Sequence, residues 1–465
     1  MSRQVTEQTF FHYIKCPHWV YLDAHGLEPH PHDPLLEKLM DDGLLEEKQR
    51  EIISDRTDLA EVMAEDLEEA FMQTLAFMRE GRQTIYHGVL IERHWVGHPD
   101  VLERVEGKST LGDYYYVAAD LKHTRELKDI YKFQGCFYAE LLERIQHTKP
   151  VQGYVITPDR TVLSYLIESF ETEYHLTLME IEKILAGRHP AHFLTSGCRQ
   201  SPWYDECRHL SSSCDDLSLL NRIWREEVER LKEVGITTLE GLAQKSLHDL
   251  LRLAPGIRQD RLEILHDQAI ALSKQRVIHR SPITFLHAKQ EIYFDIESDP
   301  LRDFDYLFGV LVVEGKKATY EAFFAERPED EAMMWHSFVA FIESHLDIPI
   351  YHYGLFEQEV VHRFASRYGI STLAMEALER NMVDLLFVMR PAVIFPLSFY
   401  SLKDVAAYLG YAWRAADASG ANSVLWFEKW LEQKDPSLLQ KIKEYNEDDV
   451  RATHHVKQWL EQNAA

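Results

Sequence analysis

Hydrophobic and polar positions along the chain follow two periods, and the change of period divides the sequence into three regions. Between residues 84 and 205, short segments that alternate apolar and polar residues are mixed with segments whose apolar residues lie three and four apart. Residues 217–275 have helical spacing throughout, and from residue 281 the mixed pattern returns. Alternation predicts strands and the longer spacing predicts helices. We therefore predict an α/β multidomain protein with a helical middle.

One long amphipathic helix is expected from Pro34 to Glu80. Its residues 41–70 hold twelve Asp or Glu against three Lys or Arg, so we expect a solvated helix face outside any binding channel. The predicted strands are 84–90, 94–95, 114–122, 151–157, 292–296, 306–313 and 318–324. Besides the long helix, helices are predicted over 127–145, 171–186, 330–344 and 358–368.

The composition adds a surplus of acid. Among 465 residues, Lys and Arg total 50, Asp and Glu total 76, and the formal net charge is −26. A chain of this length makes about three domains, which we predict at residues 1–210, 211–280 and 281–465. A surface this acidic does not attract nucleic acid or anionic membranes as a whole. Carboxylates are also the ligands of metal-dependent phosphoryl chemistry, so the charge does not exclude a phosphate-containing substrate.

Signals for membranes and secretion are missing from the sequence. Its apolar runs are shorter than the ~18 residues that a membrane-spanning helix needs. The first residues lack the basic and apolar regions of a signal peptide. Five cysteines, an odd number, do not suggest a disulfide framework. We expect a cytoplasmic protein.

The first candidate site lies between residues 87 and 138. In Asp120-Leu-Lys122, the carboxylate and the ammonium group would project from one face of a strand, because alternate residues face the same way. Asp120 can hold a divalent ion, and Lys122 can stabilise a phosphate or help activate water. Asp100, near a strand end, is a candidate second ligand. Gln134 and Tyr138 are four residues apart and share a helix face.

The second candidate site is built from acidic residues of the last region. Asp295 and Glu297 share one face of an apolar strand, and Glu357 begins a helix in YHYGLFEQEV. Tyr445 and Asp449 lie side by side because they are four residues apart on a helix. Four carboxylates that converge from such elements are what two divalent ions, about 3.5–4 Å apart, need for in-line attack on a phosphodiester.

The motifs of the first site occur in a specific order: His87, then Gly-His-Pro-Asp, Asp-x-Lys and Gln-x3-Tyr. This order resembles the PD-(D/E)xK restriction-endonuclease-like core of RecB and of the RecB-like CRISPR-associated exonucleases. The resemblance implies that His87, Asp100 and Asp120 bind Mg²⁺ or Mn²⁺ and that Lys122 is catalytic. It also implies that the Gln-x3-Tyr pair contacts DNA.

The second set consists of FDIE, the glutamate at a helix start, SLKDVAAYLG and Tyr-x3-Asp. It resembles the DEDDy branch of the RNase H-like (DnaQ-type) 3′–5′ exonucleases, within the YprB-like group. The histidine branch would place a His five residues before the last Asp, where this sequence has Glu. The resemblance implies that Asp295, Glu297, Glu357 and Asp449 hold two Mg²⁺ or Mn²⁺ ions while Tyr445 orients the attacking water.

The order of the three regions resembles one family, the RecB-like nucleases with a C-terminal YprB-like ribonuclease H domain. The resemblance spans nearly the whole chain and implies a role in DNA repair, recombination or defence. Some relatives carry a helicase after these domains. Here a helicase would be a separate partner.

Iron–sulfur members of the first group bind a [4Fe-4S] cluster through one N-terminal cysteine and three cysteines after the core. Cys16, Cys198 and Cys207 fall at such positions. Ser201 stands at the fourth, and a serine alkoxide is a poorer ligand for cluster iron than a thiolate. Cys214 could replace it. A zinc ion, or no metal at all, are the alternatives.

The helical middle resembles a helix-hairpin-helix unit, with a turn at Pro255-Gly-Ile whose backbone amides would approach a DNA phosphate. Arg258 stands where a second glycine is common, and a helical spacer without nucleic-acid contacts is the alternative. Because the chain is acidic, any DNA track should be narrow and lined by cations such as Lys122, Lys132 and Arg258.

The leading prediction is a two-centre, metal-dependent nuclease. It would trim single-stranded DNA ends in the 3′–5′ direction through the C-terminal site. The first alternative is a protein that binds or scaffolds nucleic acid, with one or both sites inactive. An RNA exonuclease is the second alternative, because both catalytic cores act on a phosphodiester.

Overall fold

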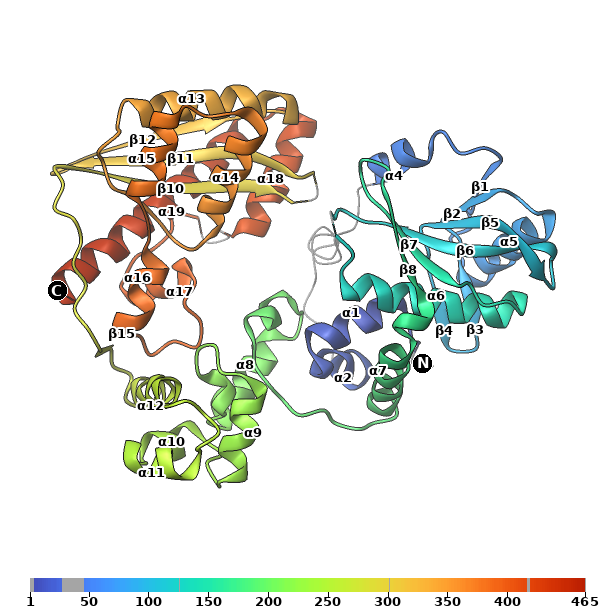
Figure 1. Ribbon diagram of the computed structural model, residues 1–465, viewed down its shortest axis with the longest axis horizontal. Coiled ribbons are helices and arrows are strands. Elements are labelled where there is room, and N and C mark those ends of the chain that lie inside the picture. The colour runs from blue at the N-terminus through green and yellow to red at the C-terminus, as the bar shows by residue number, and fades with distance from the viewer. Residues whose placement is uncertain (1–3, 27–45, 125, 301, 416–418, 465) are drawn as a thin grey trace. The chain divides into compact units, whose positions relative to one another are not determined.

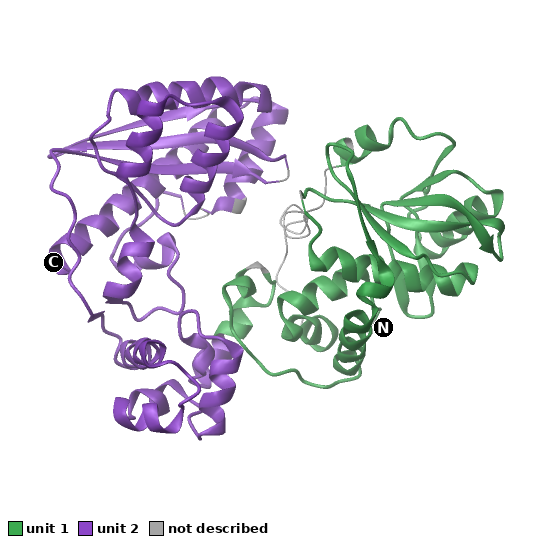
Figure 2. Cartoon of the chain, in the orientation of Figure 1, with its two compact units in different colours: residues 1–208 green, residues 209–465 purple. Residues whose placement is uncertain are grey.

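The computed structural model describes residues 4–26, 46–124, 126–300, 302–415 and 419–464 (Figure 1). Its internal contacts divide the chain into two compact units, residues 1–208 and 209–465 (Figure 2). The helices of the predicted middle segment are grouped with the second unit. None of the described helices combines the length and the apolarity that a bilayer-spanning segment requires.

A six-stranded sheet forms the centre of the first unit, in the order β1-β2-β5-β6-β7-β8. Strands β2, β5 and β6 are antiparallel, whereas β1 pairs with β2, and β7 with β6, in parallel. The hairpin of β3 and β4 forms a separate small sheet. The strand bounds are β1 Leu59–Glu61, β2 Thr84–Tyr86, β3 Leu90–Glu92, β4 Trp95–Gly97, β5 Val101–Ser109, β6 Gly112–Leu121, β7 Gln152–Ile156 and β8 Val162–Leu166.

The helices of the first unit pack on the sheet through an aromatic core. Phe10 lies 5.4 Å from the rings of both Phe137 and Tyr174, and these three side chains join α1, α6 and α7 in one layer. The helix bounds are α1 Glu7–Lys15, α2 Pro17–His25, α4 Glu46–Ile53, α5 Leu67–Glu80, α6 Asp129–Gln146, α7 Glu171–Leu185 and α8 Tyr204–Ser213, which spans the boundary between the units.

The long helix predicted over 34–80 is wrong in its described part. Helix α4 ends at Ile53, and β1 follows before α5 begins at Leu67. Asp58 adopts the left-handed conformation, with φ 50°, which a right-handed helix cannot continue. The pairing of β1 with β2 then stabilises the strand, and a contact with a distant strand leaves no trace in local periodicity. Residues 34–45 lie outside the described residues.

The second unit contains a five-stranded sheet in the order β12-β11-β10-β13-β14. The first three strands are antiparallel, and β10, β13 and β14 are parallel. The strands predicted over 292–296, 306–313 and 318–324 are present as β10, β11 and β12. The bounds are β10 Gln290–Asp299, β11 Phe304–Glu314, β12 Lys317–Phe324, β13 Ile350–His352 and β14 Met382–Asp384.

Helices cover both faces of this sheet (Figure 1). Phe294 and Phe308 pack on Phe338 of α13, and Asn446 of α19 lies on the opposite face. Helix α19 begins at Pro436, which suits a first helical turn, and Asp435 caps it by accepting a hydrogen bond from the Ser437 amide at 2.9 Å. The bounds are α13 Glu331–Glu343, α14 Phe356–Tyr368, α15 Thr372–Asn381, α18 Gly420–Gln433 and α19 Pro436–Asn463.

The second unit has further elements outside the five-stranded sheet and the helices described above. A two-stranded sheet pairs β9, Ile278–His279, with β15, Val393–Ile394. The other helices are α9 Arg225–Glu233, α10 Leu239–Ala243, α11 Leu247–Leu253, α12 Gln259–Lys274, α16 Leu385–Ala392 and α17 Leu402–Tyr408.

Candidate functional site

Three carboxylates of the second unit form the candidate site. Asp295 and Glu297 lie on β10, and Asp449 lies on α19. Each offers an oxygen atom, and these three oxygens all lie within 4.8 Å of one another. Glu297 and Asp449 are buried, whereas Asp295 is half-buried. Three acidic groups are thus held together where water screens their charges poorly.

Asn446 holds two of these carboxylates in position. Its Nδ2 donates a hydrogen bond to Asp295 Oδ2 at 2.7 Å and lies 3.5 Å from Glu297 Oε1, while its Oδ1 accepts a hydrogen bond from Tyr320 at 2.9 Å. The side chain can approach the sheet because residue 309 is glycine. A Cβ built on Gly309 would lie only 1.6 Å from Asn446 Oδ1. Neither residue was singled out from the sequence, because only the packing of α19 on β11 brings them together.

Asp449 has polar partners of its own. Trp413 Nε1 donates a hydrogen bond to Asp449 Oδ1 at 2.6 Å, and the Tyr445 hydroxyl is also hydrogen-bonded to this carboxylate. The Lys403 ammonium of α17 lies 4.7 Å from the centre of the Tyr445 ring, and its positive charge lowers the pKa of Asp449. The predicted side-by-side placement of Tyr445 and Asp449 on one helix is therefore present.

The pKa values of the three carboxylates are raised, because burial and mutual repulsion disfavour their charged forms. Desolvation, and then the charges of Asp449 and Glu297, raise the pKa of Asp295 well above its ordinary value. Burial, followed by the charge of Asp449, raises the pKa of Glu297 to about 8, and burial raises that of Asp449 to about 6. These groups therefore hold protons at a pH where exposed carboxylates are ionised, unless a cation neutralises them. Oxygen donors without sulfur or imidazole suit a hard divalent cation.

Glu357 lies close to this group but outside it. It begins α14, is buried, and its Oε2 lies 3.5 Å from His352 Nδ1. Its charge contributes to the raised pKa of Asp295, so the two carboxylates are near each other. Asp384, at the end of β14, caps α16 by accepting a hydrogen bond from the Leu386 amide at 2.9 Å, and the same Oδ1 atom accepts one from the Gly354 amide at 2.9 Å.

The residues of the first predicted site lie around the ends of β2, β5 and β6. Asp120 lies on β6, Asp100 directly precedes β5, and the His87 amide, just after β2, donates a hydrogen bond to the Asp100 carbonyl at 2.9 Å. Asp100 Oδ2 accepts a hydrogen bond from the Leu121 amide at 2.7 Å. Within the described part of this unit, His87, Asp100 and Asp120 do not form a group of ligand atoms within 4.8 Å of one another.

The other residues predicted for nucleic-acid contact differ in exposure. Lys122 is buried, and Gln134 and Tyr138 on α6 are 1% and 2% exposed. Lys132 forms an ion pair with Asp129 at 2.8 Å. The Arg258 side chain, at the start of α12, is 84% exposed and pairs with Asp260 at 2.8 Å. Contacts of these residues with nucleic acid stay predictions.

Three of the four predicted cluster cysteines are buried in the first unit: Cys16, Cys198 and Cys207. Cys16 and Cys198 are hydrogen-bonded to each other, and the charge of Cys198 also acts on Cys207. Cys214 is exposed. Ser201 is buried near Cys198, whose carbonyl accepts a hydrogen bond from the Ser201 amide at 3.0 Å.

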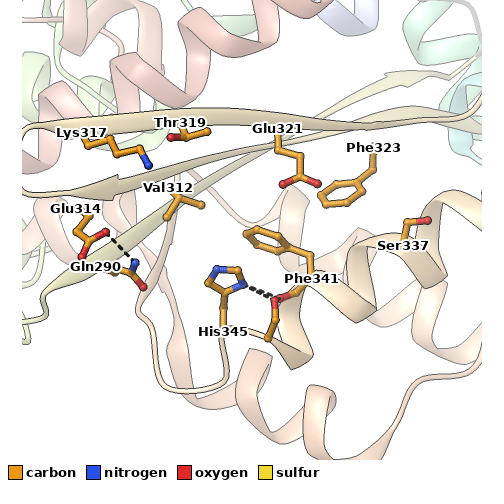
Figure 3. Close-up of a pocket in the computed structure, with 11 residues that line it drawn as sticks. Gln290, Val312, Glu314, Lys317, Thr319, Glu321, Phe323, Ser337, Phe341 and His345 are labelled. Carbon is orange, nitrogen blue, oxygen red and sulfur yellow. Dashed lines mark hydrogen bonds between the residues drawn. The ribbon is translucent and has the colours of Figure 1, made fainter.

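A cavity of about 490 Å³ in the second unit lies apart from the carboxylates (Figure 3). Glu321 of β12 and His345, just after α13, are among its lining residues. Glu321 pairs with Val310, which pairs with Phe294, and that row of side chains faces α13. Asp295 faces α19 on the other side of the sheet. The cavity is therefore no part of the candidate site.

Residues 292–461 match the family model of the RNase H superfamily, and all the residues of the candidate site fall within this span. No curated protein matches the chain. The match confirms the RNase H-like part of the sequence prediction, while the PD-(D/E)xK domain stays a prediction. The second unit contains an RNase H superfamily domain, and such a domain indicates nuclease-like activity.

Proposed function

We propose that the protein is a metal-dependent nuclease that removes nucleotides from the 3′ ends of single-stranded DNA through its C-terminal unit. One observation carries this proposal. The oxygens of Asp295, Glu297 and Asp449 lie within 4.8 Å of one another inside the RNase H superfamily domain. Close carboxylates with little water around them are unfavourable unless cations compensate their charge. The cluster therefore favours a function that uses bound cations.

The donor set fits Mg²⁺ or Mn²⁺. Its three members are carboxylates, and hard divalent cations prefer oxygen ligands. Glu357, close to Asp295, is a candidate further ligand. Divalent ions held by these residues supply positive charge that offsets the charge developing on a phosphate during hydrolysis.

Tyr445 would position the attacking water. Burial, and then the charge of Asp449, raise the pKa of the Tyr445 hydroxyl, so it keeps its proton at neutral pH. A protonated phenol can donate one hydrogen bond and accept another. It can therefore orient water but does not serve as the base. Lys403 adds a positive charge beside this tyrosine, where it can attract the nucleic-acid backbone.

A second, RecB-like PD-(D/E)xK site in the first unit is part of the proposal. In it His87, Asp100 and Asp120 would bind the ion, Lys122 would act in hydrolysis, and Gln134 with Tyr138 would support the site. The adjacency of Asp100 and Asp120 across β5 and β6 supports this arrangement. One observation favours the alternative that this unit only binds or scaffolds nucleic acid. The Leu121 amide donates a hydrogen bond to Asp100 Oδ2, which leaves this carboxylate oxygen less available to a metal ion.

End-labelled single-stranded DNA and RNA of the same sequence test the proposal. The wild-type chain with Mg²⁺ or Mn²⁺ should shorten 5′-labelled DNA stepwise, and a metal chelator should stop the reaction. Asp295→Asn should abolish this activity. The control is Glu321→Gln, which removes a carboxylate on the other face of the same sheet and should leave the activity unchanged. Metal-independent hydrolysis, or full activity of Asp295→Asn, would sink the proposal, and faster hydrolysis of RNA would change the substrate.

A further inference from the structure

Five side chains with sulfur or imidazole donors gather in the first unit, far along the sequence from the candidate nuclease residues. They are the thiols of Cys16, Cys198 and Cys207 and the imidazoles of His18 and His192. The three thiols and His18 are buried. Such a group is uncommon by chance, because each donor comes from a short segment at one end or the other of this unit.

The spacings between these donor atoms fit ligands of a single ion. His18 Nδ1 lies 3.5 Å from Cys207 Sγ, and the ligand atoms of His18, His192 and Cys207 all lie within 4.8 Å of one another. Cys16 is close enough to Cys198 for their thiols to be hydrogen-bonded. With Zn–S bonds of about 2.3 Å and Zn–N bonds of about 2.0–2.1 Å, a tetrahedral ion places a sulfur and a nitrogen ligand about 3.6 Å apart. A [4Fe-4S] cluster inserts iron and sulfide between its thiolates and needs more room.

The surroundings of the donors also suit metal ligation. The Thr195 amide donates a hydrogen bond to Cys198 Sγ at 3.3 Å. Cys16 stands at the N-cap of α2, directly before the helix that carries His18. N–H donors around ligand sulfurs are the supporting contacts that metal sites use.

The fourth thiolate that an iron–sulfur cluster would need is not among these donors. Ser201 stands at the expected position, and its hydroxyl oxygen accepts a hydrogen bond from the Trp203 amide at 3.1 Å. Cys214 is exposed, in contrast to the three buried thiols. The imidazoles of His18 and His192 supply donors beside Cys207 instead.

We propose that His18, His192, Cys198 and Cys207 form a closed tetrahedral site that binds one structural Zn²⁺ ion, with the Cys16 thiol hydrogen-bonded to Cys198 beside it. With four protein ligands the ion has no open position, which is typical of structural rather than catalytic zinc. The site would tie the start of α2 to α8, because His18 and Cys207 are 189 positions apart in the sequence. It differs from the iron–sulfur cluster that the family resemblance implies, and it does not depend on the proposed nuclease function.

Metal analysis of the full-length chain, purified without added metal or chelator, tests the site. We expect about one zinc and no iron per chain. Cys207→Ser should lose the zinc, and His18→Ala should bind it more than about 100-fold more weakly, because removing a ligand costs more than the 10- to 100-fold typical of a lost outer-shell partner. Cys214→Ser is the matched control and should keep the zinc. Iron with acid-labile sulfide, no metal, or zinc that survives Cys207→Ser would overturn the proposal.

A second measurement covers the case in which a variant fails to fold. The wild-type chain is stripped of metal and titrated with Co²⁺, whose absorption spectrum reports its ligands. Intense visible bands of tetrahedral Co²⁺ together with near-ultraviolet thiolate charge-transfer bands are expected, and Zn²⁺ should abolish both. Weak octahedral bands without charge transfer would contradict a site of two thiolates and two imidazoles.

Discussion

In the C-terminal unit, the oxygens of Asp295, Glu297 and Asp449 come within 4.8 Å of one another, with an amide from Asn446 between two of them. In the N-terminal unit, Asp120 lies on β6 and Asp100 directly precedes the adjacent strand β5, where the Leu121 amide donates a hydrogen bond to the Asp100 carboxylate. Both sets were predicted from the same kind of signal, acidic residues near strand ends. The two units differ in which secondary-structure elements contribute the acidic residues of the candidate site.

This difference has a physical consequence. Acids on two adjacent strands are kept apart by the spacing of the strands, about 4.7–4.9 Å. In the C-terminal unit a helix that crosses the sheet adds a third acid, and the raised pKa values of Glu297 and Asp449 record the resulting repulsion and desolvation. In the C-terminal unit the fold holds the carboxylates close together even without a bound cation, so a cation would relieve their repulsion. We therefore expect the C-terminal site to dominate the nuclease activity.

The largest expected effect is the difference in trimming rate between the Asp295→Asn and Asp120→Asn variants. Asp295→Asn should lower the single-turnover rate of 3′-end trimming by about 10²–10³-fold, because loss of metal-borne stabilisation costs several kcal/mol and each factor of ten is about 1.4 kcal/mol. Asp120→Asn should leave most of the trimming rate intact. A larger loss for Asp120→Asn than for Asp295→Asn would reverse the comparison.

Tyr445→Phe should lower kcat by about 10²-fold, because a reactant that is misplaced by about 1 Å can cost about this much. The affinity for Mn²⁺, measured by calorimetry, should not change, because the phenol is not a proposed ligand. Tyr154→Phe removes an exposed hydroxyl bonded to Gln152 in the other unit and is the control. An unchanged kcat would show that the tyrosine has no part in the chemistry.

Asn446→Ala should weaken Mn²⁺ binding by about 10-fold, since a residue that orients metal ligands typically contributes 10- to 100-fold. The variant removes the amide that donates to Asp295 and leaves the Tyr320 hydroxyl without this acceptor. Asn463→Ala, near the end of the same helix, changes an exposed amide bonded to the Trp459 carbonyl and serves as control. Equal Mn²⁺ affinity in both variants would mean that the carboxylates need no such support.

The smallest expected effect is a pH-dependent stability of the metal-free protein. Because folding raises the pKa of Glu297 from about 4.5 to about 8, the folded state holds a proton that the unfolded state releases. The stabilisation is complete below pH 4.5 and is lost as the pH rises toward 8. In a chelator, the Tm of the second unit should fall by a few degrees, about 2–4 °C per kcal/mol, between pH 5.5 and 8.

Two comparisons check the origin of that shift. Glu297→Gln should show a flatter dependence of Tm on pH than the wild type, and Mg²⁺ should raise the wild-type Tm more at pH 8 than at pH 5.5. If the variant and the wild type shift by the same amount, the pH dependence comes from other groups.

Local pattern was informative where neighbouring residues determine the outcome. Period-two alternation predicted β10 and the shared face of Asp295 and Glu297, and the four-residue spacing predicted the contact between Tyr445 and Asp449. Strand β5, VLERVEGKS, was not predicted, because charged residues have low strand propensity. Its pairing with β2 and β6 compensates for that weakness.

The sequence by itself determined the residue types, their spacing within each helix and strand, and hence the RNase H-like signature of the last region. Only the tertiary structure decided which of these residues meet. Asn446 reaches Asp295 across 151 positions, and His18 reaches Cys207 across 189. A periodic pattern describes only neighbours along the chain, whereas such contacts depend on how helices pack on a sheet and on a glycine at position 309 that admits a side chain. For that reason the sequence indicated the chemistry of both candidate metal sites, whereas the fold decides which candidate ligands come together.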